Sequence, residues 1–406
     1  MEVIAINDLF LMREAIIQFF KSHTSLTRFI WKQSKLLMQF LGWFVPVQPK
    51  TMLFCSFGGR RFDDSPKAIY EEVCRRSEFN DWHLIWAFVS PSLHNIPRGE
   101  KIKIDSYQFF KTLLSSRVWV SNSGMDRGIG LKRKCNIKVE TWHGTPLKKI
   151  GGDEHQNSLS RNSKNKKGKL DSFTIRCAQS EYDRTILARI MHSEKDSFLL
   201  CDLPRNDGLL KYDNNDVLSI KLSLNIPVEK KVILYAPTYR EYLINEAHKT
   251  YLAPPIDFEK WNKELGDEYV VLVRAHYAVS TSLNIHNTSF VKDVSDYPFI
   301  NDLYIISDIL LSDYSSCYID FSILDRPMLC FAYDLEEYEE KRGLYMDLEE
   351  VLPCTIDKDE DSLISHIKTL DFDKASELSK QFHNRFAPNA GNASKTVVDA
   401  ILSRLN

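Results

Sequence analysis

The chain has 406 residues, which is too long for a single hydrophobic core and predicts two domains. Its 53 basic and 55 acidic residues leave a formal net charge of -2, so the overall charge gives no reason to expect nucleic-acid binding. The eight cysteines form no CxxC pair, which argues against a zinc knuckle or a disulfide framework and indicates reduced thiols in a cytosolic compartment.

Residues 1–47 differ from the rest of the chain in their mixture of apolar, aromatic and basic residues. Apolar residues recur at near-helical spacing from Leu26 to Phe44, with lysine and arginine between them. The uncharged stretch Leu36–Val47 is roughly half of the ~20 residues that a spanning helix needs, and no small-residue cleavage site indicates a secretory signal. We therefore predict amphipathic helices that lie in a membrane interface. Packing against the chain's own domain, or a dimer contact, is the alternative.

Strands and helices alternate from residue 48 onward. The first half has predicted strands at Thr51–Phe57, Trp82–Val89, Arg117–Ser121 and Lys138–Trp142, and a helix at Pro66–Arg75 capped by Ser65. The second half has predicted strands at Lys231–Tyr235, Tyr269–Val273, Asp308–Leu311 and Pro327–Phe331, and helices at Asp361–Leu370 and Lys374–Phe386. This alternation predicts two doubly wound α/β domains, residues 48–205 and 206–386, with a cleft between them and a C-terminal helix in residues 387–406.

The stretch TWHGTPLKKIG, residues 141–151, follows a strand and breaks into Gly and Pro, where α/β enzymes place catalytic side chains. His143 can accept a proton near neutral pH, and Lys148 and Lys149 can hold anionic oxygens. A histidine and a basic pair on a tight turn suggest proton removal next to a phosphate. A buried histidine beside two solvated lysines is the alternative.

Candidate polar residues in the second half also follow predicted strands, where ligands of open α/β sheets bind. Ser315 and Ser316 precede a helix whose free N–H groups could bind an anion, or they merely cap that helix. Arg274 and His276 flank Ala275 and could hold a diphosphate, although a lone histidine in such a place is more often structural.

Further polar residues have both a functional and a structural interpretation. Thr238 and Arg240 offer a hydroxyl and a bidentate phosphate ligand, or else a turn cap and a surface ion pair. Three polar residues at the domain junction are ligand candidates or hinge contacts: Arg205, Asn206 and Asp207. Asp320 and Asp325 could bind a ribose or cap local structure. No phosphate loop, GxGxxG strand turn, HExxH, GxSxG or kinase catalytic loop is present, and no cluster supports a protein-bound metal.

Seven segments match one known family in order. They are FGGRRFDDSPKAIYE, TWHGTPLKKIG, LPRND, ILYAPTYRE, the VRAH strand end, LLSDYSSCYIDFSILDRPMLCF and RGLYMDL. Together they resemble the CDP-glycerol glycerophosphotransferase family, the bacterial teichoic acid primases and polymerases. The resemblance implies a GT-B fold, two Rossmann-like domains facing a cleft, held peripherally on the cytoplasmic face of the bacterial cell membrane. That location agrees with the amphipathic N-terminal segment.

The resemblance also implies a reaction. An alditol phosphate moves from a CDP-alditol, CDP-glycerol or CDP-ribitol, onto a hydroxyl of a lipid-linked saccharide or polymer acceptor, and CMP is released, in teichoic acid or capsule biosynthesis. No protein-bound cofactor is expected, and a requirement for a divalent cation is left open. The partners implied are these substrates and the membrane surface, without nucleic acid. A homo-oligomer is one option for the assembly.

The family's motif residues carry over to positions of this chain. The first motif histidine is His143, expected to be the general base, and the second is His276, expected to donate to the diphosphate as CMP leaves. The substrate-binding set expected from the matching motifs is Gly144, Thr145, Lys148, Arg205, Asn206, Asp207, Thr238, Arg240, Arg274, Asp313, Ser315, Ser316 and Asp320. Arg274 and Arg240 would compensate charge, and Thr238, Ser315 and Ser316 would cradle the donor phosphates.

Four departures from the family pattern leave the alditol and the acceptor undecided. The usual RxHP ends in Tyr277, no glycine precedes PRND, the early DNP reads Asp64-Ser65-Pro66, and PNAGNAS replaces a more acidic C-terminal ending. None of them removes a catalytic group. A nucleotide-sugar transferase or epimerase of GT-B type and a non-catalytic binding protein of the polymer pathway are the two alternatives.

Overall fold

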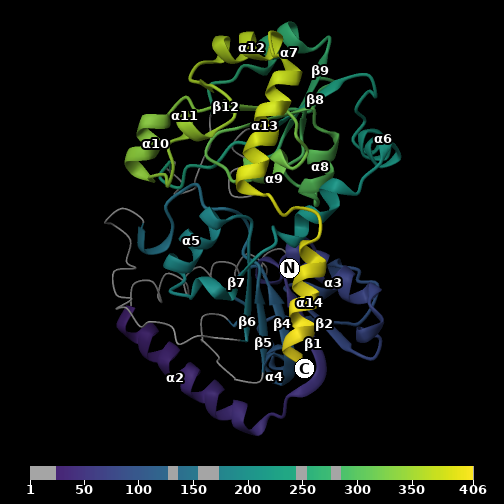
Figure 1. The fold of residues 1–406 in the computed structure, drawn as a ribbon, viewed down its shortest axis with the longest axis vertical. Coiled ribbons are helices and arrows are strands. Elements are labelled where there is room, and N and C mark those ends of the chain that lie inside the picture. Colours follow the sequence, from purple (N-terminus) through teal and green to yellow (C-terminus); the bar gives the residue numbers. More distant parts are fainter. Residues whose placement is uncertain (1–23, 127–135, 154–172, 244–253, 276–284, 406) are drawn as a thin grey trace, which may run out of the picture.

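The computed structural model describes residues 24–126, 136–153, 173–243, 254–275 and 285–405, which form two α/β lobes stacked along the long axis of the molecule (Figure 1). The N-lobe is built on a seven-stranded sheet of order β3-β2-β1-β4-β5-β6-β7, and the C-lobe on a six-stranded sheet of order β10-β9-β8-β11-β12-β13. All of the paired strands in both sheets are parallel.

The elements have the following bounds. The N-lobe strands are β1 Gln48–Cys55, β2 His83–Phe88, β3 Glu100–Lys103, β4 Ser116–Ser121, β5 Ile137–Glu140, β6 Thr174–Ala178 and β7 Phe198–Leu200. The C-lobe strands are β8 Lys231–Tyr235, β9 Tyr269–Val273, β10 Val291–Asp293, β11 Ile309–Ser312, β12 Met328–Phe331 and β13 Ile356–Asp357. The helices are α2 Thr24–Phe44, α3 Asp64–Arg75, α4 Tyr107–Ser115, α5 Glu181–Ile190, α6 Asn214–Ser223, α7 Phe258–Leu265, α8 Ile300–Ile306, α9 Cys317–Ser322, α10 Leu335–Lys341, α11 Leu348–Val351, α12 Glu360–Lys368, α13 Phe372–Phe386 and α14 Ala393–Leu405.

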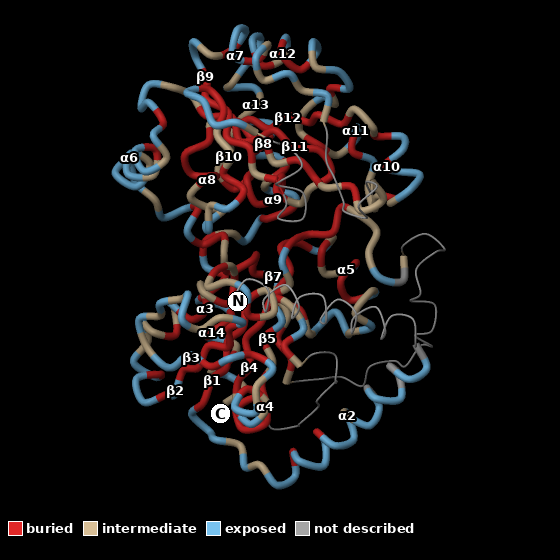
Figure 2. Tube along the Cα trace, turned by 180° about the vertical axis from the view of Figure 1, so that it is seen from behind, coloured by how far each residue is buried: buried red, intermediate tan, exposed pale blue. Residues whose placement is uncertain are grey.

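Most residues of the central strands β1 and β8 are apolar and buried, because both faces of each sheet are covered. In β1, Met52 and Phe54 pack into one core cluster while Leu53 and Cys55 pack into another on the opposite face. In β8, alternate residues divide between two clusters in the same way. Figure 2 shows the strands of both lobes buried beneath more exposed helices. Such continuous apolar runs are the sequence signature of buried parallel strands, which is why the strands at residues 231–235 and 269–273 agree with the prediction to the residue.

Strand order determines where each sheet can bind a ligand. In the N-lobe the order reverses direction between β1 and β4, and in the C-lobe it does so between β8 and β11. Open α/β sheets bind ligands at the carboxyl ends of the strands on either side of such a reversal. The loops that follow these strands come together at the junction of the two lobes (Figure 1).

Helix α14 joins the C-terminal end of the chain to the N-lobe. It packs on α3 and on the 3-10 helix Pro204–Leu210 at the junction between the lobes. Val397, Val398 and Ile401 lie in the same buried cluster as Met52 and Phe54 of β1. Within the described residues the chain therefore passes from one lobe to the other twice, once before α6 and once between α13 and α14 (Figure 1).

Some local predictions differ from the structure. Helix α3 begins at Asp64, and the cap position is Asp63, so the prediction that Ser65 caps this helix is wrong. The hydroxyl of Ser65 instead accepts a hydrogen bond from the backbone N–H of Arg205. Strand β5 ends at Glu140, two residues before the predicted end, because Trp142 has a φ of +59° and belongs to the following turn.

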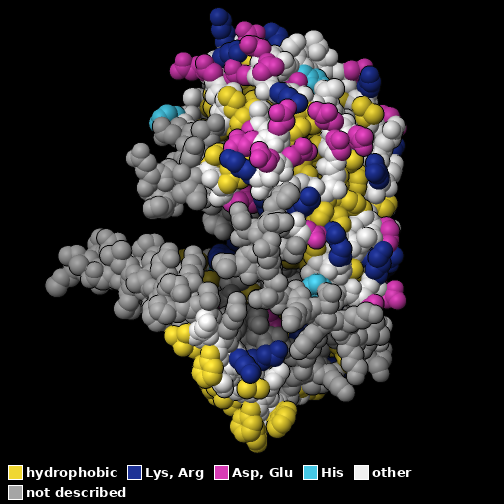
Figure 3. Space-filling model, turned by 90° about the vertical axis from the view of Figure 1, so that its left-hand side faces the viewer, with side chains coloured by type: hydrophobic (Ala, Val, Ile, Leu, Met, Phe, Trp, Pro, Cys, Tyr) yellow, Lys and Arg dark blue, Asp and Glu magenta, His cyan; other side chains and the backbone are white. Residues whose placement is uncertain are grey.

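Helix α2 leaves most of its apolar side chains exposed. Leu37, Phe40, Trp43 and Phe44 are all more than half exposed, while Met38 is buried against the N-lobe. Figure 3 shows hydrophobic side chains gathered at the end of the N-lobe where α2 lies. None of the helices in the described residues is long and apolar enough to cross a bilayer.

Candidate active site

The turn after β5 presents His143 at the junction between the lobes. Gly144 has a φ of +151°, in a region that residues with a side chain rarely adopt. A Cβ atom at Gly144 would also lie 2.6 Å from Oγ of Ser316, which directly precedes α9 of the C-lobe. Glycine is therefore required at this position both by the backbone conformation and by the close approach of the other lobe.

The surroundings of His143 suit it to accept a proton. Nδ1 lies 3.0 Å from the carbonyl oxygen of Asn122, and since a carbonyl can only accept, Nδ1 carries the proton and Nε2 presents a lone pair. His143 is exposed to solvent, and its imidazole stacks on Trp142 with 4.3 Å between ring centroids. Desolvation by the surrounding protein lowers the pKa of His143, although the Asn122 carbonyl and the Asp64 carboxylate oppose this effect. The ring is therefore neutral near pH 7.

Asn122 is a site residue that the sequence did not single out. Its side-chain oxygen accepts a hydrogen bond of 2.8 Å from the N–H of Phe57, and its amide nitrogen donates to Oγ of Ser56 at 3.3 Å. These bonds tie the end of β4 to the turn after β1 and so hold the Asn122 carbonyl that orients His143. The only sequence signal was a polar residue directly after the predicted strand Arg117–Ser121.

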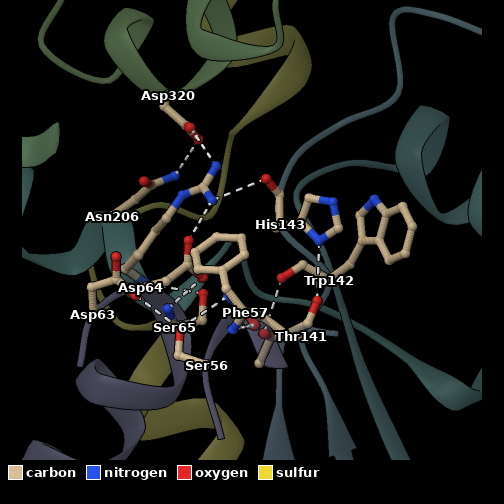
Figure 4. A network of polar contacts seen from close by, with 12 residues as sticks. Ser56, Phe57, Asp63, Asp64, Ser65, Thr141, Trp142, His143, Asn206 and Asp320 are labelled. Carbon is tan, nitrogen blue, oxygen red and sulfur yellow. Dashed lines mark hydrogen bonds and ion pairs between the residues drawn. The ribbon is translucent and has the colours of Figure 1, made fainter. Parts of the chain in front are cut away.

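Arg205 connects the two lobes beside His143. Figure 4 shows Asp64, Asp320 and His143, the three residues that the Arg205 side chain contacts. Its guanidinium donates to Asp64 of the N-lobe at 2.8 Å, to Asp320 of the C-lobe at 2.5 Å and to the carbonyl oxygen of His143 at 3.0 Å. Burial alone would lower the pKa of Arg205, but the Asp320 and Asp64 carboxylates outweigh that effect and raise it. Arg205 thus lies beside His143, with its charge already compensated by two carboxylates.

A buried polar network surrounds Asp320. Asn206 donates to this carboxylate at 2.8 Å and Gln179 at 3.4 Å, and the hydroxyl of Thr145 donates to Gln179 at 2.8 Å. Thr145 and Asn206, both expected to bind substrate, are almost fully buried within this network. Their hydrogen bonds hold in place the turn that carries His143 and the 3-10 helix Pro204–Leu210.

Two further carboxylates lie in the same network. Asp202 accepts a hydrogen bond of 2.7 Å from Gln179, and Asp183 accepts one of 3.0 Å from the N–H of Gln179. Burial raises the pKa of Asp183 and of Asp202 to about 7. The sequence pattern did not predict either residue as part of the site.

A cavity of about 690 Å³ opens beside this network, between the lobes. Arg205, Ser315, Ser316 and Asp320 line it, as do residues of α3 and α8. Basic and acidic side chains are equal in number along its wall: Arg61, Lys67, Arg75, Arg205, Lys211 and Arg274 against Asp63, Asp64, Glu71, Asp207, Asp302 and Asp320. A basic side chain that is paired with a carboxylate has its charge compensated. The ion pairs within the wall therefore decide which cation can bind an anionic ligand.

Arg274 lines this cavity and, among the described residues, has carbonyl partners in place of carboxylates. Its guanidinium donates to the carbonyl oxygens of Tyr297 at 2.7 Å and Val294 at 3.5 Å. Desolvation lowers the pKa of Arg274, yet a guanidinium keeps its charge at any physiological pH. A partly buried positive charge held by two carbonyls can bind an anionic oxygen strongly.

Arg240 has a different position from the one expected of a phosphate ligand. Its side chain is 0% exposed and forms a bidentate pair with Asp334, at 2.7 and 2.9 Å, and a further ion pair with Asp313 at 2.7 Å. The rings of Tyr314 and Tyr338 lie about its guanidinium. Because its donors are occupied, Arg240 holds the loops after β8 and β11 together in this structure and does not face the cavity.

Asp313 and Thr238 belong to the same loop connection. Asp313 accepts hydrogen bonds from the backbone N–H groups of Thr238 and Tyr314, at 2.9 and 2.6 Å. The hydroxyl of Thr238 is buried and has no hydrogen-bond partner among the described residues. Asp207 is also a structural acceptor, since its two carboxylate oxygens receive the N–H groups of Ala393 and Ser394 at the start of α14.

Lys148 contacts the C-lobe at a second interface between the lobes. Its backbone pairs with Leu344, and its ammonium lies 5.6 Å from the ring centroid of Tyr239. Desolvation lowers the pKa of Lys148, with Glu241 opposing this effect. His276 lies outside the described residues. Within those residues, no group of three or more His, Cys, Asp or Glu side chains is arranged to hold a metal ion.

Two parallel α/β lobes that meet at the carboxyl ends of their strands, with a histidine and a cavity at the junction, are the architecture of an α/β enzyme with an interlobe site. Residues 37–403 match the family model described as CDP-glycerol:poly(glycerophosphate) glycerophosphotransferase. The chain belongs to this family.

Similar proteins agree with that assignment. The teichoic acid glycerol-phosphate transferase of Staphylococcus aureus is 37% identical over 331 residues, which are 78% of this chain and 83% of that protein. The teichoic acid poly(glycerol phosphate) polymerase of Staphylococcus epidermidis is 33% identical over 368 residues, 87% of this chain but only 51% of the relative. The wall teichoic acid polymerase TagF, alone and as a variant with CDPG soaked in, has a TM-score of 0.81 and 30% identity, covering 96% of this chain and 98% of each TagF chain.

Proposed function

We propose that this protein transfers glycerol phosphate from CDP-glycerol to a hydroxyl of a lipid-linked acceptor and releases CMP, in the synthesis of teichoic acid or a related capsule polymer. The observation that carries the proposal is His143, a neutral histidine whose Nε2 is unprotonated, beside an interlobe cavity of about 690 Å³ that Arg274 lines. The glycerol-phosphate transferases and polymerases among its relatives support glycerol as the alditol. CDP-ribitol is the second candidate donor.

In the proposed reaction His143 acts as the general base. Nε2 takes the proton of the acceptor hydroxyl while the oxygen attacks the phosphorus that bears glycerol. The new P–O bond forms as the P–O bond to the cytidine-bearing phosphate breaks, and CMP leaves with that electron pair. Arg274 and the hydroxyls of Ser315 and Ser316 stabilise the negative charge on the transferring group. His276, by the family pattern, donates to the diphosphate as CMP departs.

Several residues of the expected site have a positioning role in this proposal. Arg205 fixes the histidine turn through the His143 carbonyl and joins Asp64 of one lobe to Asp320 of the other. Gly144 lets the same turn approach Ser316. Because positioning of a reacting group can account for a large part of a rate enhancement, these contacts matter even where they touch no substrate.

The proposal also includes a GT-B arrangement and attachment to the cytoplasmic face of the membrane. The support for attachment is α2, whose Phe40, Trp43 and Phe44 are exposed on a helix that also carries Lys32 and Lys35. Exposed aromatic and aliphatic side chains with basic neighbours are typical of helices that lie in a bilayer interface. Such attachment would bring the enzyme to its lipid-linked acceptor.

The test is CMP release from CDP-glycerol and from CDP-ribitol with a lipid-linked saccharide acceptor. His143→Ala should lower the rate by about 10²–10⁴-fold, the usual contribution of a general base. His83→Ala is the matched control, because His83 is an exposed histidine of β2 in the same lobe. Wild-type turnover by a folded His143→Ala protein would contradict the mechanism.

Ligand binding separates the alternatives. Thermal stabilisation by CDP-glycerol or CMP supports the proposed donor, since a ligand that binds the folded state raises its stability by mass action. Stabilisation by a UDP-sugar without any effect of CDP or CMP would instead identify a nucleotide-sugar enzyme. Binding to membranes or polymer with no CMP release under any donor and acceptor would indicate a non-catalytic member.

A further inference from the structure

The segment that follows the His143 turn forms backbone hydrogen bonds with the other lobe. Residues 147–150, the interlobe strap, run antiparallel to residues 343–345 of the C-lobe. The N–H of Tyr345 donates to the carbonyl oxygen of Leu147 at 2.8 Å, and the N–H of Lys149 donates to that of Gly343 at 3.0 Å. Two such bonds on either side of one residue pair are the pattern of an antiparallel ladder. The N-lobe and the C-lobe are therefore joined here through the backbone itself.

Leu147 anchors the strap in the core of the C-lobe. Its side chain is only 2% exposed and lies in the same buried cluster as Val232 of β8 and Leu310 of β11. Leu344, which pairs with the strap, is partly buried against the same cluster. Apolar burial is the main favourable contribution to packing. The strap is therefore held by the C-lobe, although it directly follows the N-lobe turn in the sequence.

Tyr345 adds side-chain contacts at the far end of the strap. Its hydroxyl accepts a hydrogen bond of 3.2 Å from the N–H of Ile150 and donates one of 2.7 Å to the carboxylate of Asp153. Arg189 of α5 pairs with the same carboxylate at 2.7 Å and lies over the Tyr345 ring, 5.6 Å from its centroid. Hydrogen bonds to an ionised carboxylate are stronger than neutral ones. Tyr345 therefore holds the strap and α5 together from the C-lobe.

The path from the strap back to His143 is short and held along its length. Three residues separate His143 from Leu147, so the two positions are at most about 14 Å apart along an extended chain. Between them, the hydroxyl of Thr145 donates into the buried network at 2.8 Å, and the carbonyl oxygen of Pro146 accepts a hydrogen bond of 3.1 Å from the hydroxyl of Tyr182. A displacement of the strap would therefore be passed on to the turn that carries His143.

We propose that the interlobe strap sets the distance between His143 and the bound donor, with Leu147 and Tyr345 as positioning residues. The inference rests on the proposed transfer reaction and adds how its base is kept in register with the other lobe. Ser315 and Ser316, which would hold the donor phosphates, belong to the C-lobe, whereas His143 follows a strand of the N-lobe. Because the strap is anchored in the C-lobe, a movement between the lobes carries the turn along with the donor site.

Such a role predicts a loss of rate without a loss of donor affinity. A misplacement of a reacting group by about 1 Å can lower a rate by about 10²-fold. Neither Leu147 nor Tyr345 is among the residues that line the interlobe cavity, so their substitution leaves the donor contacts in place. An interaction that matters only in the transition state lowers kcat and kcat/KM together.

The first experiment is Tyr345→Phe, which removes the hydroxyl and keeps the ring. The kcat for CMP release should fall about tenfold, because the strap loses its bonds to Ile150 and Asp153. The Kd for CDP-glycerol, measured by calorimetry, should stay within about twofold of wild type. Tyr107→Phe is the matched control, since Tyr107 is an exposed tyrosine of the N-lobe and its variant should keep the wild-type kcat.

The second experiment removes the apolar anchor. Leu147→Ala should lower kcat about tenfold or more, and Leu147→Met should restore it to within about threefold of wild type, because a swap that conserves volume keeps the packing. Leu363→Ala is the control, since Leu363 is a fully buried leucine of α12 in a different C-lobe cluster. Its Tm should fall while the kcat of the folded protein is retained. Tyr345→Phe carries the test by itself if Leu147→Ala does not fold.

A double variant separates positioning of the base from a general structural role. Since the strap acts through His143, adding Tyr345→Phe to the His143→Ala protein should cost less than about a further twofold in kcat. A tenfold loss in both backgrounds would overturn the inference. So would a wild-type kcat for folded Tyr345→Phe, or a tenfold rise in its Kd for CDP-glycerol, which would make Tyr345 a substrate ligand.

The wild-type protein distinguishes this inference from the proposed function. Absence of CMP release from wild-type protein with CDP-glycerol and with CDP-ribitol would refute the transfer reaction itself. CMP release that depends on His143, together with strap variants that behave as wild type, would refute only the positioning role.

Discussion

Arg205→Ala tests whether the arginine at the lobe junction is a structural bridge or a substrate ligand. In the structure its guanidinium pairs with Asp64 and Asp320, and the three side chains are 11%, 7% and 5% exposed. Removal of the arginine leaves two buried carboxylates without their cation. Loss of one partner of a buried ion pair lowers the free energy of unfolding by about 3–5 kcal/mol. For a lobe of this size about 1 kcal/mol changes Tm by about 2–4 °C, so a fall of about 6–20 °C is expected.

The measurement is thermal and urea unfolding of the full chain, with CDP-glycerol binding measured at a temperature where the variant is folded. Arg205→Ala and Asp320→Ala, alone and combined, form a double-mutant cycle, and a coupling energy of about 0.5–3 kcal/mol or more is expected for residues in direct contact. Arg76→Ala is a control ion-pair variant, since Arg76 pairs with Glu72 and the more exposed Asp399 on the outer face of the N-lobe. Unchanged stability together with a large loss of CDP-glycerol affinity would refute the bridge and make Arg205 a ligand.

Three further predictions follow from particular contacts. Gly144→Ala should lower CMP release by about 10²-fold with the fold retained, because the added Cβ displaces the turn that carries the base; turnover like that of wild type would show that the close approach to α9 is unimportant. Burial raises the pKa of Asp183 and Asp202 from 3.8 to about 7, so their protonated forms stabilise the native state below pH 4 and this stability is lost as the pH rises through 7. Asp183→Asn and Asp202→Asn should flatten that part of the stability profile, measured by urea unfolding from pH 4 to pH 8, and an unaltered profile would contradict the raised pKa values. Phe40→Ser combined with Trp43→Ser should weaken binding to anionic lipid vesicles in a sedimentation assay without lowering Tm, and unchanged sedimentation would contradict the interfacial role of α2.

Strand positions and the histidine turn could be predicted because they depend on local pattern. A strand buried on both faces needs an uninterrupted apolar run, and such runs mark β8 and β9 with their correct ends. The turn that follows β5 and carries His143 and Gly144 is likewise visible in the sequence, because Gly and Pro residues end the strand. Short elements were harder to predict. Strand β3 has one buried residue among four, so no apolar pattern marked it.

The two arginines that follow β8 and β9 show what the sequence leaves open. Arg240 and Arg274 each lie just beyond a buried strand, and both were expected to hold phosphate. Arg240 meets Asp334, which is 94 residues further along the chain, and is neutralised there. Arg274 meets only backbone carbonyls among the described residues and lines the cavity.

The sequence by itself therefore determined the family, the parallel strands and the histidine at the turn. Buried strands require runs of neighbouring apolar residues and tight turns require Gly or Pro, so both can be recognised locally in the sequence. Only the tertiary structure decided which charged groups compensate one another and which face a cavity. The partners of Arg205 come from α3 and α9, which are 141 and 115 residues away from it. Coulomb energies depend on distance in space, and the folding of two sheets onto a common junction sets those distances.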